Sequence, residues 1–291
     1  MAEKFDIYSM ITDRIVAELE KGQIPWHKPW VGTRGCIAHT TGRPYSVLNQ
    51  LMLEKPGEYL TFKQINAEGG KVKKGEKANV VVFWKPWVTT GTNKEGEEVK
   101  KTIFLLRYYN VFHIDQTEGI KPKYDKKPPK HAEPDAEAEA IIADYLKRTG
   151  IRMYREKGDR AYYSPMMDEI HVPLMEQFPD TAEFYSTAFH EMTHSTGHES
   201  RLNRLSKDAH FGSEDYSKEE LVAEIGAASL NMQCGLENKD SFRNSTAYIQ
   251  SWIRALKDDK KLITSASSKA EKAVKYILNE QDNQDEIKEE E

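Results

Sequence analysis

The pattern of apolar positions predicts a first half that mixes helix and strand. Apolar residues recur every four positions over residues 7–19, which predicts an amphipathic helix that ends near Gly22. Residues 78–84 and 102–112 are rich in β-branched and aromatic residues, as strands are, and the polar segment 90–98 suits a long hairpin loop between them. The first half is therefore predicted to be an α+β domain with an antiparallel sheet.

Helical spacing dominates the second half. It occurs in residues 135–148, 182–195, 217–233, 241–258 and 265–279. Residues 161–173 instead favour two short strands around a turn, which would form a small antiparallel sheet just before the second of these helices. Within it, residues 167–172 are expected to be an edge strand that could pair with an extended peptide. The second half is thus predicted to be mainly helical, and the whole chain α+β.

The composition is that of a soluble globular chain long enough for two modest domains. It has 291 residues, of which 38% are hydrophobic. No segment approaches about 18 consecutive apolar residues, and the charged N-terminus lacks a secretory signal, so we expect no membrane association and a cytoplasmic location. Cys36 and Cys234 are too few for a disulfide framework or a thiolate-rich zinc knuckle. A metal site here would have to use His, Asp or Glu.

The charge changes sign along the chain. Residues 1–130 contain 22 Lys and Arg against 15 Asp and Glu, whereas residues 131–291 contain 20 against 32. The change falls in a Pro/Lys-rich stretch that cannot pack a core. We therefore predict an N-terminal domain over residues 1–120, a linker over 121–134, a second domain over 135–280, and a disordered acidic tail over 281–291.

The chemistry is concentrated at His190, Glu191 and His194, which form a His-Glu-x-x-His pattern inside a predicted helix. Histidines four apart project from one helix face and can bind one metal ion, and the glutamate reaches the same side. Zinc held with one open position lowers the pKa of a bound water to about 7, and Glu191 would serve as the general base. The pattern predicts a zinc peptidase, with another divalent metal such as Mn²⁺ as an alternative. A surface helix with two histidines is the simpler interpretation.

A third protein ligand is needed. The metzincin spacing fails because Ser200 stands where its third histidine would be, and His198 lies just past the end of the predicted helix. Glu220 and Glu224 share one face of the next helix, beside small residues that permit close packing. We assign Glu220 as the third ligand and Glu224 as a group that orients a ligand histidine, an arrangement similar to that of gluzincins. Glu219 is the runner-up, and solvated carboxylates are the simpler alternative.

Two residues between the motif and the acidic helix are candidates for donating a hydrogen bond to a substrate carbonyl. His210 and Tyr216 are the nearest such donors in the sequence. Their spacing does not choose between them, so both are kept as possible transition-state donors.

Aromatic residues alternate with basic residues in several segments of the first half, such as residues 83–87. Ring faces beside cations suit single-stranded nucleic acid, because bases stack on rings and Lys or Arg neutralises phosphates. The candidate contacts are Trp26, Lys28, Trp30, Arg34, Arg43, Tyr45, Lys71, Lys73, Lys74, Lys77 and Trp84. The same rings could be core anchors and the lysines a solvated turn, so composition alone leaves this function open.

Ordered blocks along nearly the whole chain resemble the ArdC-type antirestriction proteins of conjugative plasmids. In the first half the blocks are residues 25–30, 41–45, 60–64, 74–77, 82–84 and 108–112, and in the second half 189–198, 200–204, 211–214 and 219–228. The first half resembles their single-stranded-DNA-binding domain, which is also found in TraC-type primases. The second half resembles their zincin-like metallopeptidase domain.

The resemblance implies non-specific binding of single-stranded DNA and protection of incoming conjugative DNA from host restriction. An unidentified host protein would be the peptidase substrate. The alternative is a DNA-binding shield, or a primase-accessory protein, whose zincin domain is structural or a docking surface. Glu191 favours an active peptidase, because a purely structural site needs no general base. A nuclease or primase is less favoured, since the sequence shows no acidic two-metal motif.

Overall fold

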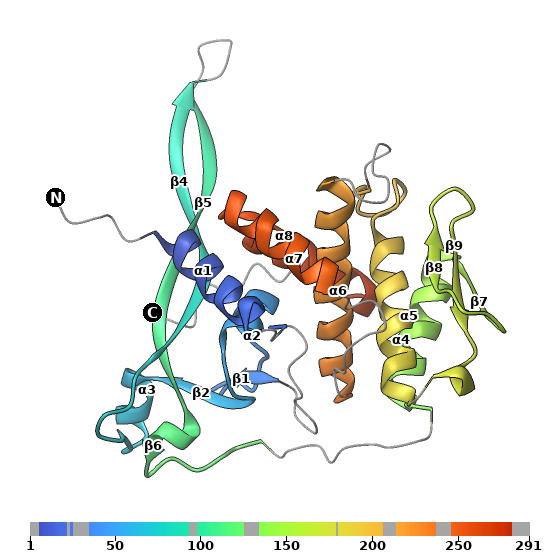
Figure 1. The fold of residues 1–291 in the computed structure, drawn as a ribbon. Coiled ribbons are helices and arrows are strands. Elements are labelled where there is room, and N and C mark those ends of the chain that lie inside the picture. Colours follow the sequence, from blue (N-terminus) through green and yellow to red (C-terminus); the bar gives the residue numbers. More distant parts are fainter. Residues whose placement is uncertain are drawn as a thin grey trace.

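The helices of the second half lie between two sheets, one from each half of the chain (Figure 1). The computed structural model describes residues 6–21, 24–25, 35–92, 98–124, 134–178, 180–205, 214–236 and 246–280. Residues 125–133 of the predicted linker and the predicted tail lie outside these ranges. In the part of the chain that is described, no helix is long and apolar enough to cross a membrane.

The first half forms a four-stranded sheet flanked by helices. Its helices are α1 (Ile7–Glu20), α2 (Val47–Met52) and α3 (Phe62–Ala67), and its strands are β1 (Cys36–Ala38), β2 (Gly57–Thr61), β3 (Lys71–Val72), β4 (Asn79–Thr92), β5 (Glu98–His113) and β6 (Thr117–Glu118). The sheet order is β1-β2-β5-β4, and β3 pairs with β6 separately. The expected antiparallel pairing holds for β2, β5 and β4, while β1 joins β2 in parallel, so the sheet is mixed.

Strands β4 and β5 form a two-stranded arm that extends away from this sheet (Figure 1). Their pairing continues to Thr92 and Glu98, well past the predicted strand ends. At the base of the arm, the side-chain amide of Asn49 donates to the Val82 carbonyl and accepts from the Val82 N–H, both at 2.8 Å. These two bonds tie α2 to the free edge of β4, so the arm has a fixed base.

The second half contains the five helices that its periodicity predicts. They are α4 (Ala136–Thr149), α5 (Thr181–Thr196), α6 (Glu214–Cys234), α7 (Thr246–Asp258) and α8 (Leu262–Leu278). Its strands are β7 (Arg152–Glu156), β8 (Tyr162–Ser164) and β9 (Glu169–Pro173). The predicted boundaries of α4, α5 and α8 agree with the structure to within a few residues, and α6 begins earlier than predicted.

The small sheet corrects one expectation. Its strand order is β7-β9-β8, with β9 parallel to β7 and antiparallel to β8. The prediction of an edge strand over residues 167–172 is therefore wrong, because β9 is paired on both sides. The pattern did not reveal β7, which lies about 17 residues earlier in the chain and fills the other side of β9.

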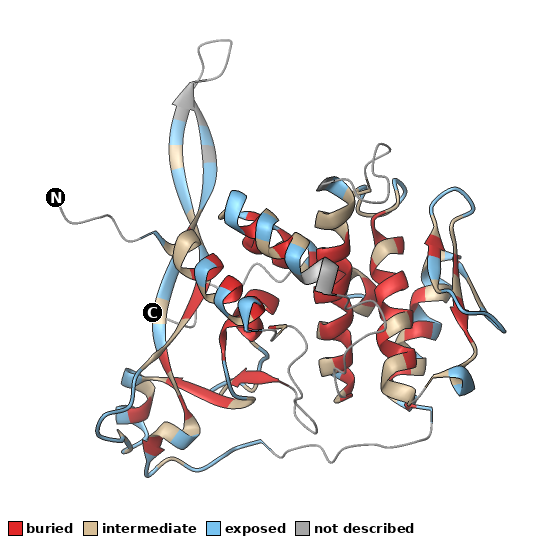
Figure 2. Ribbon diagram, in the orientation of Figure 1, coloured by how far each residue is buried: buried red, intermediate tan, exposed pale blue. Residues whose placement is uncertain are grey.

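The two halves share one hydrophobic core. Ile15 of α1 belongs to the same cluster of buried residues as Ile225 of α6 and Ile263 of α8. The cluster also includes Trp252 and Leu256 of α7, and buried positions are visible on α6 and α8 (Figure 2). At the rim, Lys257 of α7 pairs with Glu20 of α1 at 2.6 Å. The apolar face of α1 is thus completed by helices from the far end of the chain.

We expect Ile263→Ala to destabilise both halves together, because Ile263 is fully buried in this shared core. Removing such a side chain lowers the free energy of unfolding by about 2–5 kcal/mol. In chemical denaturation, pulsed hydrogen exchange of α1 reports on the first half, and circular dichroism reports on the helices. Both signals should shift to the same lower midpoint, and Lys272→Ala, at an exposed position of α8, should leave them unchanged. An exchange transition of α1 that does not move would contradict the shared core.

Candidate metal centre

Helix α5 presents the two histidines of the motif from one side, one turn apart. The helix begins after Asp180, whose carboxylate accepts a hydrogen bond of 2.9 Å from the Glu183 N–H and so satisfies a free donor of the first turn. His190 and Glu191 are buried, and His194 is close to buried. Helix periodicity, a good cap and burial together fix the direction of the imidazoles.

Helix α6 packs against α5 and faces it with acidic side chains. Glu220 and Glu224 are both buried, which is rare for carboxylates that lack a partner. The close approach of the helices depends on Gly226, because a Cβ atom there would lie 2.7 Å from Cγ2 of Thr193. The small residue at position 226 therefore lets α6 bring its carboxylates up to the histidines.

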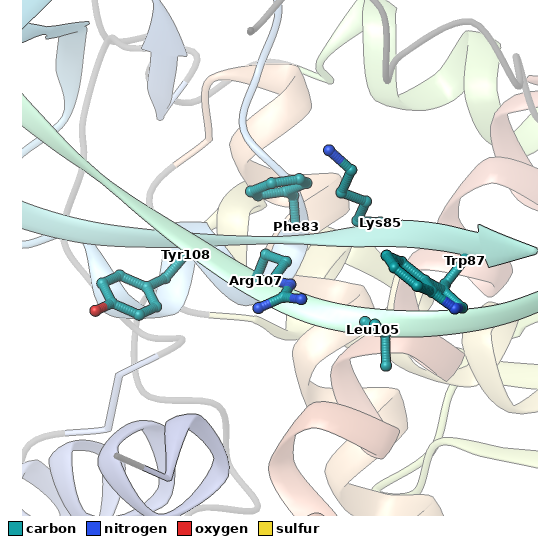
Figure 3. Close-up of a pocket in the computed structure, with 6 residues that line it drawn as sticks. All are labelled: Phe83, Lys85, Trp87, Leu105, Arg107 and Tyr108. Atoms are coloured by element: carbon teal, nitrogen blue, oxygen red, sulfur yellow. The ribbon is translucent and has the colours of Figure 1, made fainter. Parts of the chain in front are cut away.

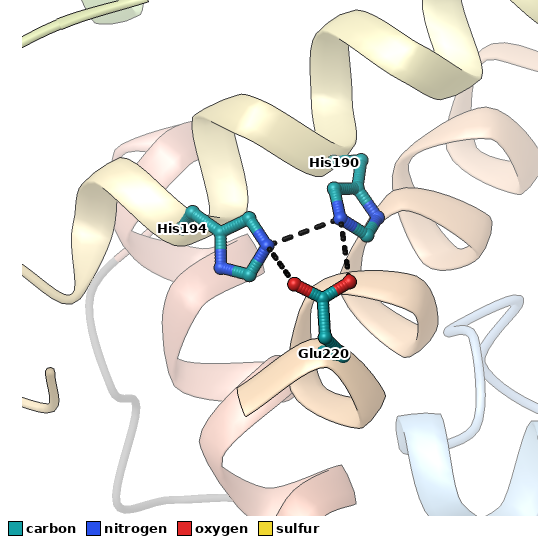
Figure 4. A group of neighbouring side chains, drawn as sticks. All are labelled: His190, His194 and Glu220. Atoms are coloured by element: carbon teal, nitrogen blue, oxygen red, sulfur yellow. Dashed lines mark hydrogen bonds and ion pairs between the residues drawn. The ribbon is translucent and has the colours of Figure 1, made fainter. Parts of the chain in front are cut away.

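Three potential metal ligands converge between these helices (Figure 4). His190 Nε2 lies 3.0 Å from His194 Nε2, and the Glu220 carboxylate lies 3.5 Å from the first nitrogen and 3.3 Å from the second. Ligands bound at about 2.0–2.1 Å around a tetrahedral ion are separated by about 3.3 Å. Two imidazoles and one carboxylate are also the donor set of many catalytic zinc sites. The arrangement therefore fits a divalent metal.

The outer nitrogen of each histidine faces a further carboxylate of α6. His190 Nδ1 lies 3.3 Å from Glu224, and His194 Nδ1 lies 3.2 Å from Glu219. Arg204, in the segment after α5, donates two hydrogen bonds of 2.8 Å to the Glu219 carboxylate. Carboxylates in this position fix the orientation of a ligand imidazole and increase its basicity. Glu224 and Glu219 thus fix the orientation of the two imidazoles, whose Nε2 atoms are directed toward the other ligands.

Mutual attraction within this cluster outweighs the cost of burial. Burial alone would lower the pKa of His194, but its contacts with Glu219 and Glu220 raise that pKa to about 10. Burial would also lower the pKa of His190, but its contacts with Glu220 and Glu224 raise that pKa. Burial would raise the pKa of Glu220, yet the two histidines hold that pKa well below its usual range. In the metal-free protein the imidazoles therefore retain protons that a metal would have to displace.

The predicted general base and the predicted carbonyl donors do not belong to the group of three converging ligands. Glu191 is buried in α5, directly after the first histidine. Tyr216 is partly buried in the first turns of α6, and His210 lies outside the described residues. His198, which the sequence left as a distant possibility, contacts the Ser200 hydroxyl at 2.8 Å and is not among the converging ligands.

The predicted nucleic-acid contacts fall into three groups. Four lie outside the described residues, namely Trp26, Lys28, Trp30 and Arg34. Six are exposed, namely Arg43, Lys71, Lys73, Lys74, Lys77 and Trp84. Tyr45 is partly buried and packs edge-on against Tyr59 with ring centroids 6.2 Å apart, so its ring contributes to a core. Trp84 is the one of the exposed six that lies on the arm.

The sequence did not predict Arg204 as a member of the metal cluster, and it offered Glu219 as an alternative third ligand without predicting its contact with the outer nitrogen of His194. Arg204 follows α5 in an irregular segment, where no periodicity shows which way a side chain points. Glu219 contacts the outer nitrogen of His194, a role that depends on the rotation of α6. The indirect signal was the surplus of carboxylates on one buried helix face, which requires compensating positive charge nearby.

Both halves match known families. Residues 5–112 match the N-terminal domain of the anti-restriction factor ArdC, and residues 136–269 match the zincin-like metallopeptidases. Two proteins from Escherichia coli named DNA primase TraC are 34% and 35% identical over 96% of this chain, but the chain spans just 20% and 28% of their lengths. The uncharacterized protein y4eC of Sinorhizobium fredii is 28% identical over 95% of this chain and 92% of its own length.

Crystal structures of the antirestriction protein ArdC from plasmid R388 have the same fold. The Mn(II)-bound structure is 36% identical, with a TM-score of 0.75, over 94% of this chain and 98% of that chain. The metal-free structure is 37% identical, with a TM-score of 0.75, over 95% of this chain and 100% of that chain. Because the match extends over nearly all of both proteins and agrees with the order of the two family assignments, this chain belongs to the ArdC family of antirestriction proteins and has its two-domain fold.

Proposed function

We propose that this protein is a zinc-dependent endopeptidase joined to a single-stranded-DNA-binding half, and that it protects incoming conjugative DNA from host restriction. The convergence of His190, His194 and Glu220 at spacings that suit a tetrahedral ion carries the peptidase part of the proposal. The zincin-like match of residues 136–269 supports it. The R388 protein was crystallised with Mn(II), but an imidazole-rich site favours zinc over manganese by ligand type and by intrinsic affinity.

The side chains around the ligands have complementary roles in this proposal. A bound zinc ion would polarise the scissile carbonyl and allow water to attack near neutral pH. Glu191 would accept the proton of the attacking water and return it to the leaving amine. Glu219 and Glu224 hold the two imidazoles in position through their outer nitrogens. Tyr216 remains a candidate donor to the carbonyl oxygen, and so does His210.

DNA binding is proposed for the first half. It is supported by the match of residues 5–112 to the N-terminal domain of ArdC and by the excess of Lys and Arg over acidic residues in that half. Binding to the incoming strand in the cytoplasm would bring the peptidase close to host proteins that attack it. One of those proteins is the proposed substrate, and the shared core would keep both activities at a constant distance.

The second candidate function is a DNA-binding shield or primase-accessory protein whose zincin domain is structural or a docking surface. The similarity to the TraC primases favours it, although those proteins are several times longer than this chain. The glutamate between the two histidines favours an active peptidase, since a structural site needs no general base.

Metal binding is expected to release protons, because the metal requires neutral imidazoles and the pKa of His194 in the metal-free protein is raised to about 10. A raised pKa stabilises the metal-free fold below the ordinary value of 6.5, and this contribution is lost as the pH rises through about 10. Apparent metal affinity should therefore increase with pH across this window. Calorimetric titration of zinc in two buffers with different ionisation enthalpies measures the released protons, and equal heats in both buffers at neutral pH would contradict the prediction.

Glu191→Gln should slow peptide hydrolysis about 10²- to 10⁴-fold while leaving the metal bound, because it removes the proton acceptor and keeps the size of the side chain. Hydrolysis of an unfolded protein substrate by the zinc-loaded full chain gives the rate, and elemental analysis gives the metal content. The same variant is then tested for protection of a conjugative plasmid entering a restricting host.

Protection should fall together with hydrolysis if proteolysis carries the function. If zinc-loaded Glu191→Gln protects as well as the unchanged protein, the proteolytic account is wrong and the shield is favoured. Glu280→Gln, at an exposed position after α8, is the matched control and should retain both activities.

A further inference from the structure

The β4–β5 arm exposes an unusual number of large apolar side chains. They are Trp84, Trp87, Val88, Ile103, Phe104 and Tyr108, each between 40% and 60% exposed. Pale-blue exposed positions recur along both strands of the arm, whereas α5 and α6 are mainly red (Figure 2). These side chains lie on both sides of the ribbon, with Trp87 and Ile103 on one side and the other four on the opposite side. Large apolar side chains exposed in such number on a folded protein indicate an interaction site. The residues around it indicate what it binds.

Aromatic rings and cations are combined on one side of the arm. Phe83, Lys85 and Trp87 occupy alternate positions of β4, and Arg107 and Leu105 are the register partners of Phe83 and Lys85. Side chains at such positions share one side of a ribbon. These five residues and Tyr108 line a hollow of about 320 Å³ along the paired strands (Figure 3). Trp87 is 56% exposed there, so a flat ligand can reach its ring.

The described charged side chains of the arm are of one sign. They are Lys85, Lys100 and Arg107, and no Asp or Glu is present among the described side chains of the two strands. Lys85 and Arg107 are diagonal neighbours on the side that carries the hollow, so the lining there is basic. The hollow therefore combines ring faces for stacking with the exposed guanidinium of Arg107 for a negatively charged ligand.

Single-stranded nucleic acid satisfies both features at once, because its unpaired bases stack on aromatic rings while its phosphates meet Lys or Arg. An acidic peptide would use the cations and leave the rings without a matching partner. A duplex would keep its base faces covered by its own stacking. The combination of rings and cations therefore selects the single strand.

We infer that this side of the arm, formed by Phe83, Lys85, Trp87 and Arg107, is a stacking site for single-stranded DNA. The inference rests on the proposed DNA binding of the first half and gives it a location. Trp84 lies on the opposite side of the ribbon, at the position between Phe83 and Lys85, and is outside this site. The site therefore includes one of the two exposed tryptophans of the arm.

The test uses the full chain, since α1 needs the C-terminal helices to complete its core. A fluorescent oligothymidine of about 16 nucleotides, enough to span one binding fold, is titrated by anisotropy. Trp87→Ala should weaken binding about 5- to 100-fold, and Trp87→Phe should retain most of the affinity because a ring remains. Phe62→Ala removes a ring of α3 that is 57% exposed and lies outside the arm, so it is the matched control and should bind like the unchanged protein.

Arg107 tests the phosphate contact separately. Arg107→Ala should reduce the slope of log affinity against log salt concentration by about 0.7, the value for one phosphate of a single strand. Arg107→Lys should restore the slope, because it restores the charge. Lys100→Ala, which removes a charge from the opposite side of the arm, should leave the slope unchanged. Each substituted residue is exposed, so circular dichroism should show an intact fold.

The outcomes separate the inference from the proposed function. If the unchanged protein fails to bind the oligonucleotide, both are wrong. If it binds and neither Trp87→Ala nor Arg107→Ala alters the affinity, DNA binding stands but the arm site is wrong. If Trp87→Ala instead converts a dimer to a monomer in sedimentation and leaves the affinity unchanged, the surface contacts a second copy of the chain, which also overturns the inference.

Discussion

The contact between α5 and α6 is the constraint on which the rest of this structure depends. It buries Glu220 and Glu224 against two imidazoles, and such a cluster is stable only when its charges compensate one another. Gly226 permits the close approach, and Arg204 supplies a fixed positive charge behind Glu219. The helices could pack with a simpler apolar interface at lower desolvation cost, so the retention of these groups is best explained by the metal that they fit.

Helix α6 also connects this site to the first half of the chain. Its carboxylates face α5, while Leu221, Val222 and Ile225 belong to the core that includes α1, α2 and α8. A helix that is buried on all sides cannot move independently of either neighbour. The metal site and the base of the arm are therefore parts of one packed unit, which is consistent with a protein whose two halves act on the same DNA-associated target.

The sequence predicted local features better than long-range ones. Helical periodicity was sufficient for α1 and for α4 to α8, and the spacing of the histidines with the acidic face of α6 was sufficient to select the residues that the structure brings together. The sequence did not reveal that β7 pairs with β9, or that α1 packs on α7 and α8, because an apolar face does not specify its partner. The side of the arm that each tryptophan occupies also required the strand register.

We propose that His190, His194 and Glu220 hold one metal ion. Anomalous diffraction at the zinc absorption edge, from crystals of the zinc-loaded protein, tests this metal site most directly. We expect a single strong peak between α5 and α6, about 2.0–2.2 Å from Nε2 of each histidine and from a carboxylate oxygen of Glu220. A peak bound through His198 or Glu219, or a Glu220 side chain turned away from the ion, would contradict it.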